Sequence, residues 1–285
     1  MSWRAVVISN SSKLEYQLGY LIIRNEKKHK IHLSEIHTII IESTQVVITT
    51  TLISELIKKK IKIIFCDEKH NPQSELVSYY ASHDTSGKLK KQLSWTDYDK
   101  EKAWQIVLNY KITAQKNFLT DLNKITEAEK LDSYINSDME NKEAISAKVY
   151  FSGVFGNVFT RYIRSPINDC LNYGYTLLLS AFNREITSQG YITQVGIFHR
   201  NNINHFNLSS DLMEPFRIIV DRLVYAVQPQ ENLNKEYKNK LQELFNYQVM
   251  ISGRKQYLNN AINMYTHSVF DSLNNGREIL MYNEI

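Results

Sequence analysis

Three segments of the chain carry side chains whose types and spacing could support catalysis, and the first contains Glu143 within ENKEAISAKVYF. On a helix, Met139, Glu143, Ala147, Tyr150 and Val154 share one stripe, so Glu143 is a carboxylate on an otherwise apolar face. Burial of a carboxylate is costly unless the group is paired, protonated or bound to a metal. An ion pair with an arginine of a neighbouring helix is the structural alternative to a metal ligand.

The second segment, VGIFHRNNINHF, places His199 directly after an apolar run and His205 six residues later. Two nearby histidines can bind a metal, but this spacing matches no standard zinc motif and neither cysteine is close in sequence. A single histidine is more often a satisfied core or surface residue than a ligand. This segment taken alone is therefore a weak sign of a metal site.

The third segment, SSDLMEPFRIIVDRL, carries three acids on one face of a predicted helix: Asp211, Glu214 three residues later, and Asp221 seven beyond that. A structural explanation is that Asp211 is an N-cap and Glu214 completes a capping box, where both acids suit the helix dipole. The face lies opposite an apolar stripe, so it is either solvated or the wall of a cleft.

Two or more carboxylates and one imidazole together form a mixed set of oxygen and nitrogen donors. That set suits Mg²⁺ or Mn²⁺, which prefer oxygen but accept imidazole, better than a structural zinc ion. Such ions polarise phosphoryl groups and stabilise the charge on leaving oxygens. Reactions at phosphate are therefore the chemistry that a joint site would favour.

The elements that must position these side chains change character along the chain. Up to residue 80, short β-branched runs predict strands at Arg4–Ile8, Gln17–Arg24, Lys30–Leu33, Thr38–Ile41, Gln45–Thr49 and Ile61–Cys66, with one helix at Leu52–Lys59. Beyond residue 95 the pattern predicts helices at Asp97–Phe118, from a Ser137/Glu140 capping box to Phe159, from Ser165-Pro166 to Gly190, at Asp211–Tyr225, and from Lys238 onward. We expect an α+β fold: a small N-terminal β-rich domain (1–80), a linker (81–95) in which His83–Leu93 is a linker or a mobile loop, and a larger all-helical C-terminal catalytic domain (96–285).

Composition limits the class of protein. The 285 residues include 34 Lys and Arg against 30 Asp and Glu, a net charge of +4, which permits a nucleic-acid partner without identifying one. A hydrophobic fraction of 43% excludes a disordered chain. Cys66 and Cys170 are isolated in sequence, which excludes a disulfide scaffold and predicts two reduced, buried thiols. No signal peptide and no membrane-spanning run is apparent, so we expect a cytoplasmic protein.

The sequence resembles a known family through blocks that span nearly the whole chain: MSWRAVVIS, LISELIKKKIKIIFCDEKHNP, EAISAKVYF, INDCLNYGYTLL, VGIFHR and FNLSSDLMEPFRIIVD. The family is the CRISPR-associated adaptation integrase-nuclease, which inserts new spacers into CRISPR arrays. The nearest resemblance is to the branch found beside the RNA-guided effector nucleases of type II systems.

The resemblance implies a metal site made of Glu143, His199 and Glu214, with Asp211 as an auxiliary acid and Mg²⁺ or Mn²⁺ as the ion. His199 holds the expected place after the apolar run and is preferred over His205 on that ground. Many relatives have glycine after the first glutamate, where this chain has Ala144, a small change that a helix tolerates.

The resemblance also implies an activity and partners. A spacer 3′-hydroxyl attacks a phosphodiester at each end of the first repeat, and with water as the nucleophile the same site is a nuclease. The implied partners are double-stranded DNA, a second copy of the chain bound through the β domains, a small dimeric companion subunit and, in type II systems, a DNA-end-binding ring protein and the effector nuclease. Candidate DNA contacts, chosen by residue type, are the lysines of residues 88–91 and Lys148, Arg161, Arg164, Arg200, Arg217 and Arg254.

Two alternatives to this activity belong to other classes of protein. One is a DNA-binding scaffold of the same complex that keeps the fold and has lost catalysis, and the complete set of three ligands argues against it. The other is an unrelated metal hydrolase of small molecules, which the family blocks and the lack of a glycine-rich phosphate loop argue against.

Overall fold

The computed structural model describes residues 4–68, 72–76, 84–135 and 141–284, and its first part is a pair of four-stranded sheets. One sheet has the strand order β1 (Arg4–Ile8), β5 (Ile36–Ile41), β7 (Lys62–Cys66), β8 (Pro72–Glu75), in which the first three are parallel. The other has the order β4 (Lys28–His32), β3 (Tyr20–Arg24), β2 (Ser12–Gln17), β6 (Val46–Ile48). Helix α1 (Thr50–Lys58) and the short turn η1 (Leu33–Glu35) complete this part.

The two sheets enclose an apolar core to which α1 contributes. Leu14 and Leu21 from one sheet, Ile39 from the other, and Leu52 and Leu56 from α1 are all fully buried in one cluster. The Thr49 hydroxyl caps α1 by accepting the Leu52 N–H at 3.4 Å.

The remaining residues form mostly helices: α2 (Thr85–Ser94), α3 (Asp97–Asp121), α4 (Ile125–Tyr134), α5 (Lys142–Phe155), α6 (Pro166–Ser188), α7 (Asn207–Leu212), α8 (Arg217–Val227), α9 (Lys235–Gln242) and α10 (Leu258–Asn275). The single turns η2 (Glu214–Phe216) and η3 (Glu243–Asn246) join some of them. A small antiparallel sheet of β10 (Arg254–Tyr257), β9 (Gln248–Ile251) and β11 (Tyr282–Glu284) packs among the helices.

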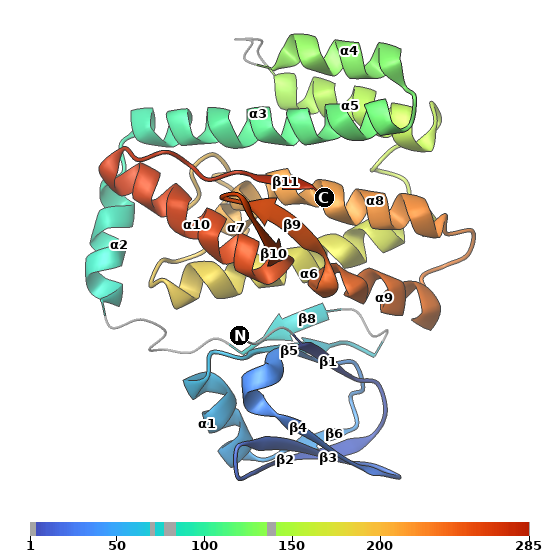
Figure 1. Cartoon of the computed structure of the whole chain (residues 1–285), viewed down its shortest axis with the longest axis vertical. Coiled ribbons are helices and arrows are strands. Elements are labelled where there is room, and N and C mark those ends of the chain that lie inside the picture. Colours follow the sequence, from blue (N-terminus) through green and yellow to red (C-terminus); the bar gives the residue numbers. More distant parts are fainter. Residues whose placement is uncertain (1–3, 69–71, 77–83, 136–140, 285) are drawn as a thin grey trace.

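Helix α6 runs through the middle of the molecule, with the two large sheets at one end and α3, α4 and α5 at the other (Figure 1). Fourteen of its residues are buried, so other elements cover it on most of its surface. Ile40, Ile64 and Cys66 of the first sheet belong to the same apolar cluster as the helices. The first sheet therefore shares an apolar core with the helices, while the core between the two sheets is a separate cluster.

The predicted α+β class is confirmed in outline, and three details of it are wrong. The C-terminal part is not all-helical, because β9, β10 and β11 lie within it. Most of the expected linker is not a loop, because Thr85–Ser94 forms helix α2. The single strand expected at Gln17–Arg24 is instead the end of β2, a tight turn and then β3. Leu18 and Gly19 form the turn, and both have positive φ.

Other expectations about the fold have mixed outcomes. The strand at Arg4–Ile8 is confirmed, and the helices around α1, α3 and α6 begin and end within a few residues of the predicted positions. The Ser137/Glu140 capping box and Met139 lie outside the described residues. The division of the chain at residues 80 and 95 stays a prediction. No helix within the described ranges is long and apolar enough to cross a membrane.

Candidate active site

The side chains of Glu143 and Glu214 meet at the ammonium group of Lys111, which lies in the middle of α3. Lys111 Nζ is 2.9 Å from Glu143 Oε1 and 2.7 Å from Glu214 Oε2. Glu143 is in the first turn of α5 with 28% of its side chain exposed, whereas the Glu214 side chain in η2 is only 5% exposed. The structure thus brings two of the predicted ligands together, on a lysine that the sequence motifs had not indicated.

Glu214 is placed by a break between two helices. Helix α7 ends at Leu212, η2 follows, and α8 begins at Arg217, where one helix over Asp211–Tyr225 had been predicted. Pro215 explains the break, because proline lacks an N–H and its ring clashes with the preceding helical turn. Arg217 then returns toward Glu214 and donates from Nε to Oε1 at 2.9 Å.

Both structural explanations offered for the acids of this segment are wrong. Asp211 lies near the end of α7 and not at an N-cap, and Glu214 lies in a 3-10 turn, so no capping box forms. Asp211, Glu214 and Asp221 are all buried, so their face is not solvated. Asp221 belongs to a separate cluster, where it accepts hydrogen bonds from the Tyr150 and Tyr175 hydroxyls.

Charges around Glu214 keep it ionised despite its burial. Burial alone would raise the pKa of Glu214, but Arg217 and Lys111 outweigh that effect and lower the pKa to about 2. Burial likewise acts to lower the pKa of Lys111, and the Glu214 and Glu143 carboxylates raise it above the usual value. Both groups of the pair are therefore charged at neutral pH.

His199 is held by Asp211 in a segment without regular secondary structure. Asp211 Oδ1 lies 2.5 Å from His199 Nδ1 and accepts the His199 backbone N–H at 3.1 Å. The other oxygen, Oδ2, accepts the N–H groups of Ile197 and Phe198 at 2.7 and 3.0 Å. The Asp211 hydrogen bond raises the pKa of His199 above its ordinary value.

The contacts of Asp211 indicate different roles for Asp211 and His199. Histidines that bind a metal through one ring nitrogen commonly donate from the other to a carboxylate, which fixes the orientation of the ring. Nδ1 of His199 is engaged in this way, which leaves Nε2 for a ligand. Asp211 uses both oxygens on the 197–199 segment, so it orients His199 and is not itself arranged as a ligand.

Helix α3 supports the histidine as well as the glutamates. Trp104, two turns before Lys111, stacks on Phe198 with ring centroids 4.3 Å apart and meets the His199 ring edge-on at 6.0 Å. His205 is exposed, and its ring lies edge-on to the adjacent Phe206 ring at 6.3 Å. A cleft of about 480 Å³ is lined by both histidines.

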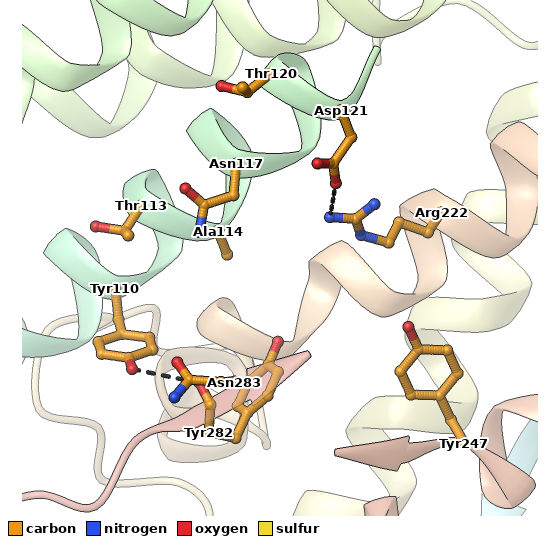
Figure 2. Close-up of a pocket in the computed structure, with 10 residues that line it drawn as sticks. All are labelled: Tyr110, Thr113, Ala114, Asn117, Thr120, Asp121, Arg222, Tyr247, Tyr282 and Asn283. Carbon is orange, nitrogen blue, oxygen red and sulfur yellow. Dashed lines mark hydrogen bonds and ion pairs between the residues drawn. The ribbon is translucent and has the colours of Figure 1, made fainter. Parts of the chain in front are cut away.

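The C-terminal strand ties the Glu214 turn to α3 from the other side. Tyr282 of β11 donates its hydroxyl to the Pro215 carbonyl at 2.9 Å, and the Tyr282 carbonyl accepts the Tyr110 hydroxyl at 3.3 Å. Figure 2 shows Tyr110 and Tyr282 together at one end of a pocket of about 520 Å³, with the Asp121–Arg222 ion pair at another. The sequence motifs had not indicated Tyr282 as a support for this site.

The basic residues proposed as DNA contacts fall into two groups. Arg217 is bound to Glu214, and Arg161 donates to Asn168 and Asn172, so both serve the local structure. Four others are exposed. Arg200 pairs with Asp97 at 3.0 Å and Arg164 approaches Asp169 at 3.7 Å, and the other two are Lys148 and Arg254. Residues 88–91 lie on α2. Their contact with DNA stays a prediction.

The donor types at this site fit Mg²⁺ or Mn²⁺. Two carboxylates and an imidazole oriented by a carboxylate are present. Glu214 Oε2 is a buried oxygen, and none of the described residues donates a well-oriented hydrogen bond to it, since its contact with Lys111 is an ion pair. Within the part of the chain that the structure describes, however, no three His, Cys, Asp or Glu side chains converge closely enough to hold an ion. The Lys111 ammonium bridges the two carboxylates instead.

Comparison with known proteins identifies the family. The family described as "CRISPR associated protein Cas1" matches residues 5–262 of the chain. The chain belongs to the Cas1 family. This membership confirms the resemblance seen in the sequence blocks.

Curated Cas1 relatives match most of the chain. A protein named CRISPR-associated endonuclease Cas1 from Neisseria meningitidis serogroup C (strain 8013) is 33% identical over 260 residues, which cover 88% of this chain and 86% of the relative. A protein named CRISPR-associated endonuclease Cas1 1 from Francisella tularensis subsp. novicida (strain U112) is 26% identical over 276 residues, which cover 87% and 86%.

Solved structures support the Cas1 fold. A structure titled "Casposase bound to integration product" has a TM-score of 0.75 at 20% identity and covers 98% of this chain and 92% of that chain. A chain of a "Cas6-RT-Cas1--Cas2 complex" has a TM-score of 0.73 at 19% identity and covers 96% of this chain and 35% of that chain. Similarity at these identities establishes the fold alone.

Proposed function

We propose that this Cas1-family chain is a metal-dependent DNA endonuclease and integrase of CRISPR adaptation that inserts new spacers into the array. The observation that carries the proposal is the convergence of Glu143 and Glu214 on Lys111, within electrostatic reach of His199, whose Nδ1 is held by the buried Asp211. Two further observations support the proposal. The curated relatives are named endonucleases, and a neighbour of this fold is a casposase bound to an integration product. The Neisseria relative is consistent with the type II branch.

The reaction is phosphoryl transfer. The 3′-hydroxyl of the incoming DNA attacks a phosphodiester of the repeat, a new P–O bond forms, and the bond from phosphorus to the repeat's own 3′-oxygen breaks. A bound Mg²⁺ or Mn²⁺ would supply Lewis-acid stabilisation of the developing charge on the phosphate oxygens. Water in place of the 3′-hydroxyl gives hydrolysis, which is the nuclease reaction.

The chain's own residues have separate tasks in this proposal. Glu143 and Glu214 would supply carboxylate oxygens for the ion, and His199 would supply Nε2. Asp211 holds the imidazole in one orientation, which reduces the reorganisation needed during the reaction. Arg217 keeps Glu214 ionised and near its observed position.

DNA and a companion subunit are the proposed partners. Neighbours of this fold have been solved as a "TtCas1-DNA complex" and as part of complexes that contain Cas2. Phosphate contacts from exposed lysines and arginines would provide most of the DNA affinity. A homodimer through the β-rich part, a DNA-end-binding ring protein, the effector nuclease and a cytoplasmic location stay predictions.

Alanine substitutions at the three proposed ligands test the function. Glu143→Ala, His199→Ala and Glu214→Ala should each lower Mn²⁺-dependent cleavage and strand transfer by about a hundredfold or more, because the ion supplies several kcal/mol to the transition state. DNA affinity should change little, since it depends on many phosphate contacts. Wild type should melt at a higher temperature with Mn²⁺, and each variant should lose that increment.

His205→Ala is the matched control and should keep both the activity and the thermal increment. An inactive His205→Ala variant beside an active His199→Ala variant would show that the histidine assignment is wrong. The inactive-scaffold alternative is favoured by one observation, the Lys111 bridge between the two glutamates. It predicts no Mn²⁺ increment in the wild type and no strand transfer with the purified companion subunit.

A further inference from the structure

Lys111 is a buried cation whose partners are both proposed metal ligands. Lysine is rarely buried unless it is paired, because its ammonium group loses hydration. Here the pairing is strong, with one carboxylate at 2.7 Å and another at 2.9 Å. The lysine is therefore held by the same oxygens that an ion would need.

The charges at this point of the molecule already cancel. Glu143 and Glu214 contribute two negative charges, and Lys111 and Arg217 contribute two positive charges in direct contact with them. A divalent ion added to this group would leave two excess positive charges in a partly buried site, where like charges repel more strongly than in water. One of the two side-chain cations must then give way.

Lys111 is the cation that can move. Arg217 is fixed by its bond to Glu214 Oε1 and by its guanidinium over the Tyr175 ring, 4.6 Å from the centroid. The ammonium of a lysine is a point charge at the end of a flexible stem of four carbons, whereas arginine is a planar group with fixed directions.

We propose that Lys111 is an internal counter-ion that competes with the divalent metal ion for Glu143 and Glu214. In the metal-free protein it neutralises both carboxylates, and it leaves at least one of them when the ion binds. This inference rests on the proposed function, since it concerns the same metal site.

Competition has a consequence for substrate binding. An ammonium displaced from a carboxylate is left near the ion with its charge uncompensated, and a phosphodiester, which carries one negative charge, lowers the excess positive charge of the site from two to one. Metal and DNA phosphate should therefore bind cooperatively, and each should raise the affinity for the other by the same factor.

A calorimetric titration of Mn²⁺ into the full chain tests the competition without measuring activity. Lys111→Met removes the charge and keeps much of the apolar stem, so it should bind Mn²⁺ about tenfold more tightly than wild type, a change of about 1.4 kcal/mol. Its melting temperature without metal should be lower than that of wild type, because two carboxylates lose a partner, and its gain on adding Mn²⁺ should be larger.

Lys116→Met is the matched control on the same helix. Lys116 pairs with Asp132 at 2.8 Å, away from the glutamates, and both partners are more exposed. This variant should bind Mn²⁺ as wild type does. Equal or weaker Mn²⁺ binding by Lys111→Met would overturn the counter-ion proposal and leave the metal site standing. No binding by either wild type or Lys111→Met would overturn the metal site as well.

Lys111→Arg provides a second test if Lys111→Met does not fold. A guanidinium holds carboxylates with two directed bonds and leaves them less readily than an ammonium does. Lys111→Arg should therefore bind Mn²⁺ at least about threefold more weakly than wild type. Binding equal to or tighter than that of wild type would contradict the proposal.

Discussion

Both oxygens of the Asp211 carboxylate are occupied by the 197–199 segment, three times by backbone N–H groups and once by the His199 ring. A side chain arranged in this way fixes a loop and an imidazole at the same time. The same contacts explain why a histidine in a segment without regular structure can have a defined orientation.

Asp211→Asn should therefore weaken Mn²⁺ binding by about 10- to 100-fold, although the residue is not a proposed ligand. The neutral amide should also lower the pKa of His199, since the hydrogen bond to the Asp211 carboxylate is the largest cause that raises it. Titration calorimetry measures the first effect, and the pH dependence of the His199 ring signals in NMR spectra measures the second.

Asp271→Asn is the control for that substitution. Asp271 lies 3.7 Å from His267 in a more exposed pair on α10, so its loss should leave Mn²⁺ binding unchanged. Unaltered Mn²⁺ affinity in Asp211→Asn would show that Asp211 stabilises the loop without positioning the ligand.

At the scale of elements, the central strand β5 carries an unusual residue. All six side chains of Ile36–Ile41 are buried, and His37 is one of them. Burial lowers the pKa of His37 well below its usual value, and the nearby charges of Arg184 and Lys62 lower it further. The strand therefore holds a neutral imidazole at neutral pH.

The depressed pKa predicts the pH dependence of stability. In the unfolded chain His37 takes up a proton near pH 6.5, whereas in the folded chain it resists protonation. The contribution of the neutral His37 to the free energy of unfolding is complete above pH 6.5. That free energy falls by up to about 1.4 kcal/mol for each pH unit below it. Urea unfolding of wild type from pH 8 to pH 5 should show this loss.

His37→Asn should lack that part of the acid sensitivity, while His267→Asn, at an exposed position, should keep it. Parallel pH profiles for wild type and His37→Asn would contradict the assignment to His37.

Some elements were predictable from local signals, and others were not. The break between α7 and α8 has a local signal in Pro215. The hairpin between β9 and β10 has one in Ser252-Gly253, where both residues have positive φ. Helix α2 lacks a side-chain cap hydrogen bond and contains Gly87, so its sequence favours a loop. Its Gln92 side chain bonds the backbone of the 192–195 segment, a contact that no local pattern encodes.

The same division holds for the site. Glu143, His199 and Glu214 could be selected from the sequence because each lies in a block with family resemblance. Lys111 could not, because it is one lysine among many on a long helix, and its partners lie 32 and 103 positions away in the chain. Only the packing of α3 against α5 and η2 brings them together.

At the scale of the whole molecule, the described residues of the β-rich part form two sheets with four edge strands, β1, β8, β4 and β6. Lysines 28 and 30 lie on β4, a common way to discourage strand pairing, whereas β6 is short and exposes Val47. Light scattering at low micromolar concentration should give about twice 33.4 kDa if the predicted dimer forms. A mass of one chain would contradict it.

The β-rich part is also joined to the helices by polar contacts, so the two parts are not expected to unfold independently. Gln242 of α9 donates to Glu42 at 2.9 Å, and Ser180 of α6 donates to Glu75 at 3.0 Å. Together with the shared apolar cluster, these contacts predict one cooperative transition for the chain.

The stacking of Trp104 on Phe198, with its edge toward His199, has an optical consequence. Indole fluorescence is sensitive to nearby charge and is quenched by paramagnetic ions such as Mn²⁺. Trp104 is buried beside the imidazole, whereas Trp95 lies in a different aromatic stack with Tyr191 and Phe270. The emission of Trp104 can thus report on the occupancy of the site in the unlabelled protein.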